Sequence, residues 1–169
     1  MKIIPIISLW QPWASLVVLG EKRIETRSWR WPKDLPSFLA IHAAKTWNGD
    51  LLRMSNQPPF QAALALHGFD AKRDLGLPFG KVVGVVRIVE YLSTNFLWDN
   101  GPRQNCLAAK YLDEFKNERA FGDYSYGRYA WAFDRHLAIE PITLRGHQGL
   151  WSWEPTQEVS DWMKDTYLP

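Results

Sequence analysis

The 169-residue chain is 46% hydrophobic and 22% charged, which is typical of a globular protein, and we expect residues 1–169 to form a single domain. Its formal net charge of +2 is too small to indicate a nucleic-acid partner by itself, and its single cysteine excludes an internal disulfide. We find no recognisable signal peptide and no apolar run long enough to span a bilayer, so we expect a cytoplasmic protein that does not bind membranes.

In chain order, the first half of the sequence combines expected strands with short helices. Residues 2–8 are rich in isoleucine, which predicts a strand. Pro12 and Gly20 suit the first position and the left-handed end of a short helix. We therefore expect a helix over residues 11–20, strands over 22–29 and 37–45, and two helical pieces within 49–69.

The second half of the sequence is dominated by one long apolar stretch. Residues 80–92 are apolar on both faces, which predicts a central strand, and Gly84 within it allows a sharp bend. We also expect a loop over residues 93–105, a helix over 106–122, strands over 128–139 and within 141–155, and a closing helix over 156–168. Since strands and helices do not alternate regularly, we predict an α+β fold whose strands close into a small β-barrel with helices packed outside.

Charged residues follow the first expected helix. In a strand over residues 22–29, Glu25 and Arg27 project from the same face, while Lys22 lies in the connection that precedes it. A lysine and an arginine beside a glutamate can hold an anion or the polar edge of a base. The same pattern also fits a solvated strand face with a surface ion pair worth less than about 1 kcal/mol.

Tryptophan is unusually frequent, with ten in this short chain, and two of them flank Gln11. Gln11 is expected at the start of the first helix, where free backbone N–H groups favour a ligand acceptor. Trp10 and Trp13 are compatible with stacking on a base, but we expect at least one of them to anchor the helix in the core.

Two further titratable residues lie in expected strands. His42 shares a strand face with Phe38 and Ala40, which favours a hydrogen-bonded core residue over a ligand contact. Glu90 lies near the end of the apolar strand, on the face of Val86, where a carboxylate can act as an acid or base or can mark where the strand leaves the core. The histidines show no metal-ligand spacing, and no phosphate-binding glycine loop is present, so we expect no metal and no cofactor.

Basic residues are concentrated around two more tryptophans. The residues are Lys22, Arg23, Arg27, Arg30 and Lys33, interleaved with Trp29 and Trp31. This pattern fits a site for single-stranded nucleic acid or a nucleotide, and fits an ordinary amphipathic strand equally well.

Residues 9–29 resemble the N-terminal signature of the ASCH domain, a branch of the PUA-like superfamily. The hallmark G-x-K-x-x-E-x-R of that family matches Gly20, Lys22, Glu25 and Arg27, and the preceding QPWA resembles its lead-in. The resemblance implies a PUA-like barrel of five or six strands and a cleft between the first helix and the barrel that binds RNA or a modified nucleotide or nucleoside. The ligand-binding residues that we then expect are Gln11, Trp13, Lys22, Glu25, Arg27 and His42.

The resemblance also implies a second possible function. One branch of small ASCH proteins hydrolyses the amide of N4-acetylated cytidine with a lysine, a threonine and a glutamate. Lys22 matches the lysine, but Glu25 stands in place of the threonine, with Thr26 next to it. If the chain is an enzyme, we expect Lys22, Glu25 and Glu90 to be its catalytic residues. A third interpretation is an interaction adaptor whose tryptophans belong only to the core.

Overall fold

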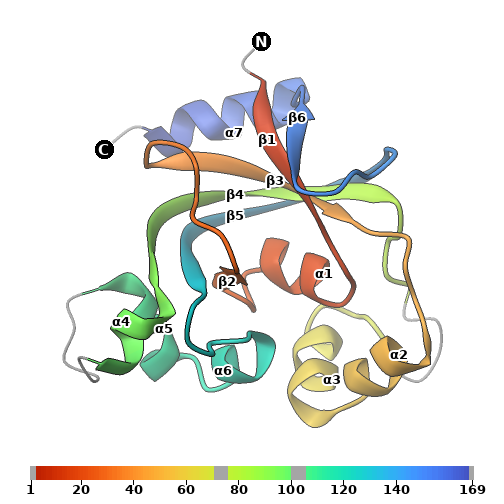
Figure 1. The fold of residues 1–169 in the computed structure, drawn as a ribbon. Helices are drawn as coiled ribbons and strands as arrows, with labels where there is room; N and C mark the ends of the chain where they lie inside the picture. Colours follow the sequence, from red (N-terminus) through yellow and green to blue (C-terminus); the bar gives the residue numbers. More distant parts are fainter. Residues whose placement is uncertain (1–2, 71–75, 100–105, 168–169) are drawn as a thin grey trace.

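The computed structural model describes residues 3–70, 76–99 and 106–167, within which the chain forms six strands and seven helices (Figure 1). The strands are β1 (Ile4–Leu9), β2 (Ile24–Arg27), β3 (Ser37–Ala43), β4 (Lys81–Ser93), β5 (Tyr129–Thr143) and β6 (Leu150–Trp153). The helices are α1 (Trp13–Val18), α2 (Gly49–Ser55), α3 (Pro58–Ala65), α4 (Thr94–Asp99), α5 (Leu107–Glu114), α6 (Glu118–Phe121) and α7 (Gln157–Tyr167). The predicted α+β class is therefore confirmed.

The six strands form one mixed sheet in the order β2-β5-β4-β3-β1-β6. β1 and β3 are parallel, and the other neighbouring pairs are antiparallel. Within the described residues the edge strands β2 and β6 do not pair with each other, so the prediction of a closed barrel is wrong.

Side chains, instead of another strand, occupy the outer edge of β2. The Ile24 N–H donates to Glu118 at 3.1 Å, and the Ile24 carbonyl accepts from the Lys22 ammonium. The Thr26 carbonyl accepts from Arg128 at 3.1 Å. Since these backbone groups are already bonded, the edge of β2 has little left to offer to a closing strand.

Helices cover both faces of the curved sheet, with α1 in its hollow and α7 on the opposite face (Figure 1). Ile7 and Ile41 pack with Val17 of α1, whereas the adjacent Ile6 and Ala40 pack on the face covered by α7. This alternation is the two-residue period of a strand whose two sides are both buried.

β4 and β5 are long and bend together around α1 (Figure 1). At Gly84 a Cβ atom would lie 2.2 Å from the Leu137 carbonyl oxygen and 2.7 Å from a Val18 methyl group. Only glycine allows this close approach, which accompanies an irregularity in the pairing of the two strands. The bend lets the start of β5 hold β2 below α1, and this arrangement forms the candidate functional site.

The loops and helices differ from the prediction in two places. The helix expected over residues 106–122 is divided into α5 and α6, because Phe115 adopts an extended backbone and lays its ring 4.3 Å from the Arg23 guanidinium. The loop expected over residues 93–105 contains α4, while residues 100–105 lie outside the described residues. Among the described helices, none is long and apolar enough to cross a membrane.

Candidate functional site

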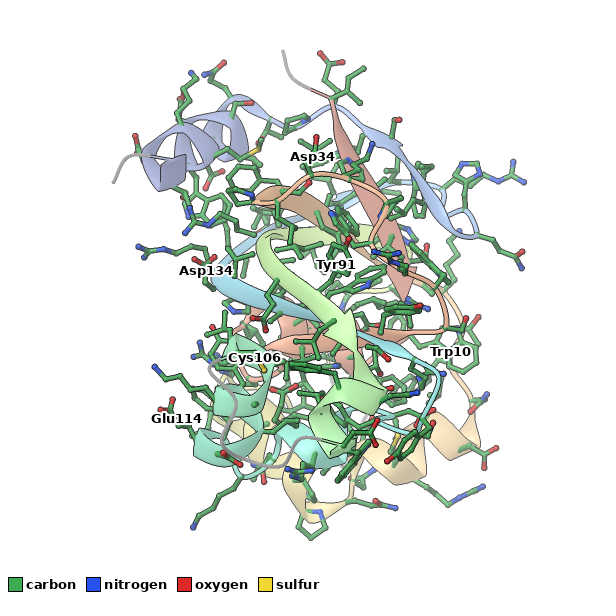
Figure 2. All side chains as sticks on the ribbon, turned by 60° about the vertical axis from the view of Figure 1, so that its left-hand side comes forward. Trp10, Asp34, Tyr91, Cys106, Glu114 and Asp134 are labelled. Atoms are coloured by element: carbon green, nitrogen blue, oxygen red, sulfur yellow. The ribbon has the colours of Figure 1, made fainter. Side chains whose placement is uncertain are left out.

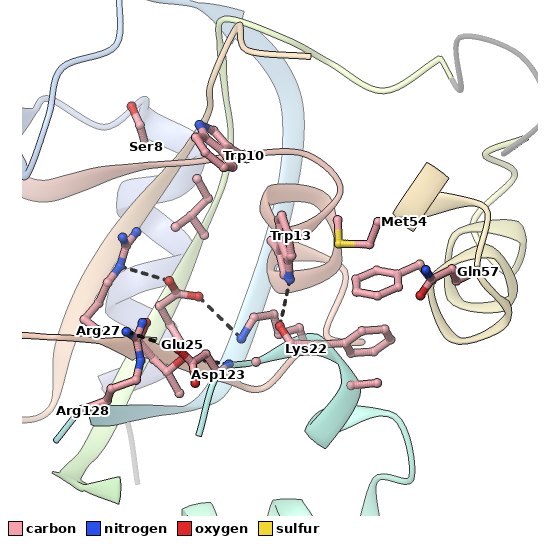
Figure 3. Close-up of a pocket in the computed structure, with 16 residues that line it drawn as sticks. Ser8, Trp10, Trp13, Lys22, Glu25, Arg27, Met54, Gln57, Asp123 and Arg128 are labelled. Carbon is pink, nitrogen blue, oxygen red and sulfur yellow. Dashed lines mark hydrogen bonds and ion pairs between the residues drawn. The ribbon is translucent and has the colours of Figure 1, made fainter. Parts of the chain in front are cut away.

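A cavity of about 620 Å³ lies between α1, β2 and the helices beneath the sheet (Figure 3). One wall is aromatic: the Trp13 ring meets Phe60 edge to face at 6.0 Å, and Phe60 meets Phe121 at 5.0 Å. The Trp13 indole N–H donates to the Phe121 carbonyl at 2.8 Å, which fixes the orientation of the tryptophan ring. This wall offers flat apolar surfaces to a ligand.

The opposite wall carries a chain of three charges (Figure 3). Glu25 lies between two cations, with Oε2 3.5 Å from Lys22 Nζ and Oε1 3.0 Å from Arg27 Nε. The Arg27 Nε atom is buried and has no hydrogen-bond partner, so its contact with Glu25 is an ion pair without good hydrogen-bond geometry. The terminal nitrogens of this guanidinium form no hydrogen bond within the described residues, and the side chain is 28% exposed, so these donors remain for a ligand.

A second ion pair completes the polar wall. Arg128 Nη1 lies 3.4 Å from Asp123 Oδ2, and its other terminal nitrogen donates to the Thr26 carbonyl. The hydrogen bond from Ser125 to Asp123 lowers the pKa of that carboxyl, with a smaller contribution from Arg128. The wall thus combines three cations with two carboxylates, a formal excess of one positive charge.

The lining is graded from a buried floor to an exposed rim. Lys22 is only 1% exposed, whereas Trp10 at the rim is 53% exposed and lies at the outer edge of the molecule (Figure 2). A volume of this size falls in the range of about 300–1,000 Å³ that ligand pockets of proteins occupy. The cavity can therefore accept a group of nucleoside size, while the rest of a longer ligand would lie outside the cavity.

Of the ligand-binding residues expected from the sequence, Trp13, Lys22, Glu25 and Arg27 line this cavity. Gln11 does not line it, because its side chain is fully buried and satisfied within the protein. Its amide donates to the Ser15 hydroxyl and the Pro78 carbonyl, each at 2.9 Å, and accepts from the Ser15 N–H. Gln11 caps α1 and joins it to the segment that precedes β4.

His42 also lies outside the cavity lining, in the core of the sheet. Its Nδ1 is 2.9 Å from the Ser8 hydroxyl and its Nε2 is 3.0 Å from the Leu144 carbonyl. Burial lowers the pKa of His42, so the ring stays neutral where a solvated histidine would be protonated.

Glu90 lies away from Lys22 and Glu25, at the start of α5. Its carboxylate accepts from the Leu107 N–H at 3.1 Å and from the Ala108 N–H at 2.9 Å, so it caps that helix. In Figure 2, Cys106 beside this cap lies well apart from Trp10 at the cavity rim.

The structure adds residues in and beside the candidate site that the sequence analysis missed. Asp123 and Arg128 enter the site because Arg27 of β2 pairs with Tyr129 of β5, directly after Arg128. Glu118 is fully buried, and its carboxylate accepts from the N–H groups of Arg23 and Ile24 and from the Tyr124 hydroxyl. Burial, and then the neighbouring Glu118, raise the pKa of Tyr124. No local sequence signal indicates these contacts, which depend on strand pairing and on a distant helix.

The described part of the chain contains no group of three or more His, Cys, Asp or Glu residues that could hold a metal ion. The main features of the site are the charged wall and the aromatic wall that faces it.

Comparison with known proteins places the chain in a family. Similar solved structures include the ASCH protein from Zymomonas mobilis, with 17% identity over 95% of this chain and 93% of that chain and a TM-score of 0.49. A single-residue variant of that protein has 18% identity over 96% of this chain and 94% of that chain, with a TM-score of 0.47. Another single-residue variant has 19% identity over 95% of this chain and 96% of that chain, also with a TM-score of 0.47. No curated protein matches the chain. The ASCH domain model matches residues 7–131, which include the whole G-x-K-x-x-E-x-R motif, and the chain therefore belongs to the ASCH domain family.

Proposed function

We propose that the protein binds RNA, or a nucleotide derived from it, with one nucleotide unit inside the cavity. The base would lie along the aromatic wall of Trp13 and Phe60, and the polar edge of the base or a phosphate would contact Arg27 and Arg128. Membership of the ASCH family is consistent with RNA-type binding.

One observation carries this proposal: the charge chain Lys22–Glu25–Arg27, in which Lys22 and Glu25 are buried and Arg27 is half-buried, lines a cavity of nucleoside size. Ion pairs that serve stability alone rarely justify burial, because desolvation of the charges offsets their attraction. Glu25 holds the two cations in place, so that Arg27 can present donors without reorganising when a ligand arrives.

The proposal is tested by titrating the protein with the four ribonucleoside monophosphates and with short RNA oligonucleotides. Arg27→Gln and Arg128→Gln should each weaken binding about tenfold, the cost of a charged hydrogen bond. Arg145→Gln is a matched control, because Arg145 is an exposed arginine outside the cavity. Equal affinity of wild type and both cavity variants for every ligand, or no binding at all, would contradict the proposal.

A second candidate function is amide hydrolysis of an acylated nucleoside in the same cavity. The observation that favours it is that the cavity is lined by the buried Lys22–Glu25 pair, two groups that can share a proton. Thr26 also lines the cavity, from the other face of β2, where its hydroxyl accepts from the Asp123 N–H at 3.3 Å. Water would supply the oxygen of the released acid, and the nucleoside amine would leave as the C–N bond breaks. Glu90 has no part in this scheme, because its carboxylate caps α5.

Incubation with a panel of acylated nucleosides, N4-acetylcytidine included, separates the two functions. Hydrolysis should be lost in Lys22→Ala and in Thr26→Val while binding of unmodified nucleotides persists in Thr26→Val. If the wild type shows no more turnover than Lys22→Ala, hydrolysis is excluded and binding is the function that remains.

A further inference from the structure

A second cavity, of about 440 Å³, adjoins the nucleotide cavity. It is lined by Trp98, Arg119, Gly122, Tyr124, Ser125 and Tyr126. Gly122 lines both cavities, so the segment that follows α6 separates them at a residue without a side chain. The Tyr124 ring fills the space beside Gly122, where a Cβ atom would lie 2.7 Å from it, so a ligand that fills the first cavity would continue into the second over the outside of this segment.

Two aromatic rings in this second cavity are exposed and fixed. Trp98 is 46% exposed and Tyr126 is 61% exposed. The Trp98 indole N–H donates to the Tyr124 carbonyl at 2.6 Å, and the Tyr126 hydroxyl donates to Asp99 Oδ1 at 2.8 Å. Because each ring has its polar atom bonded within the protein, what it presents to solvent is mostly apolar ring surface. Rings held in this way lose little conformational entropy when a base stacks on them.

A cation accompanies the two rings. The Arg119 guanidinium lies 5.4 Å from the centre of the Trp98 ring and forms no ion pair with a described carboxylate. The nearby acidic groups are engaged elsewhere, since Asp99 accepts from Tyr126 and Asp123 pairs with Arg128. Exposed rings beside an available guanidinium are the combination that single-stranded nucleic acids require, because bases stack while phosphates attract the cation.

We infer that Trp98, Arg119 and Tyr126 form an aromatic shelf that binds the nucleotide next to the one in the main cavity. The ligand is then a single-stranded polynucleotide instead of a free nucleoside. This inference rests on the proposed function and deepens it: the main cavity holds one unit, and the shelf holds its neighbour in the strand.

The inference is tested with homotrinucleotides of each base, in ribose and deoxyribose form, against the matching 5′-monophosphates. At one fixed salt concentration, we expect at least one trinucleotide to bind ten or more times tighter than its monophosphate. Tyr126→Ala and Trp98→Leu should each remove most of this difference and leave monophosphate affinity unchanged. Phe96→Ala is the matched control, because Phe96 is an exposed aromatic of α4 that lines neither cavity.

Each remaining outcome is decisive. Equal affinity of the wild type for trinucleotides and monophosphates overturns the shelf and leaves the proposed function intact, as does an equal loss of both affinities in the variants. Absence of binding to every probe overturns the proposed function itself. If Trp98→Leu fails to fold, as judged by its melting temperature, Tyr126→Ala decides alone, because Tyr126 lies in an exposed loop.

Discussion

Lys22 and Glu25 form an ion pair inside the protein, with Nζ and Oε2 3.5 Å apart and with 2% and 11% of their side chains exposed. The Lys22 ammonium also donates to the Ile24 carbonyl at the edge of β2. One residue thus completes the strand edge and supplies charge to the cavity floor, so the fold and the site depend on the same side chain.

Removal of one partner of this pair should destabilise the protein. Lys22→Met leaves Glu25 with Arg27 as its one paired cation among the described residues, and we expect the free energy of unfolding to fall by about 3 kcal/mol. The double variant Lys22→Met, Glu25→Leu should recover part of the loss, because it leaves no buried carboxylate that lacks its ammonium. Urea denaturation of the wild type, the two single variants and the double variant measures the coupling free energy between Lys22 and Glu25. If the losses of the two single variants simply add up in the double variant, the two residues are not coupled and the prediction is contradicted.

Glu118 should be as important for stability as any residue of the cavity. Glu118→Ala leaves the N–H groups of Arg23 and Ile24 and the Tyr124 hydroxyl without their acceptor, at a cost of about 3 kcal/mol or more. Glu114→Ala, which removes an exposed carboxylate from the preceding helix, should change the unfolding free energy by less than about 0.5 kcal/mol. Equal unfolding midpoints for the two variants would show that the buried carboxylate is dispensable.

A methyl group at residue 84 should disturb the bend of β4. Gly84→Ala places its Cβ against the Leu137 carbonyl and Val18, and we expect a loss of at least about 2 kcal/mol. Gly49→Ala is the control, since Gly49 begins α2 and its Cβ would have an ordinary contact of 3.4 Å with Arg53. Thermal unfolding should separate the two variants by several degrees, and similar melting temperatures would mean that β4 adapts without cost.

Acidification should destabilise the protein through His42, which is buried, and His136, which is half-buried. Burial lowers the pKa of His42 and of His136 below the ordinary value of 6.5; Arg23 lowers that of His136 further, against the opposing effect of Asp134. Below pH 6.5 the unfolded chain therefore binds more protons than the folded protein, so stability falls from there towards the lowered folded-state pKa values.

The contribution of His136 can be isolated by substitution. We expect His136→Gln to reduce the difference between the unfolding free energies at pH 7.5 and pH 5.5. An identical pH dependence in wild type and His136→Gln would mean that this histidine does not titrate on unfolding.

The charged wall of the site could be predicted from the sequence, whereas the failure of the sheet to close into a barrel could not. Two-residue alternation correctly predicted that Glu25 and Arg27 share a face, and the family motif brought in Lys22. Closure of a sheet depends instead on what satisfies its edges, and the edge of β2 is satisfied by Glu118, which is distant in sequence. Nothing in the local pattern of either segment indicates that contact.

Glu90 shows why strand periodicity fails near irregularities. Alternation along residues 80–92 gave Glu90 the direction of Val86, but the pairing of β4 with β5 shifts register around Ile88. Between Ile88 and Glu90 the register skips Val89, and an extra residue in β4 reverses the direction in which the later side chains of that strand point. The carboxylate consequently meets the start of α5, a helix whose position no pattern within β4 could have predicted.

The central claim, that a nucleotide occupies the cavity between α1 and β2, is tested most directly by NMR of the tryptophan indole N–H groups. Trp10 and Trp13 line the cavity, whereas Trp153 and Trp162 pack on the opposite face of the sheet. Titration with RNA oligonucleotides should shift the indole signals of Trp10 and Trp13 and leave those of Trp153 and Trp162 unchanged. Saturable binding that shifts Trp153 or Trp162 while Trp10 and Trp13 stay fixed would place the ligand elsewhere and contradict the account.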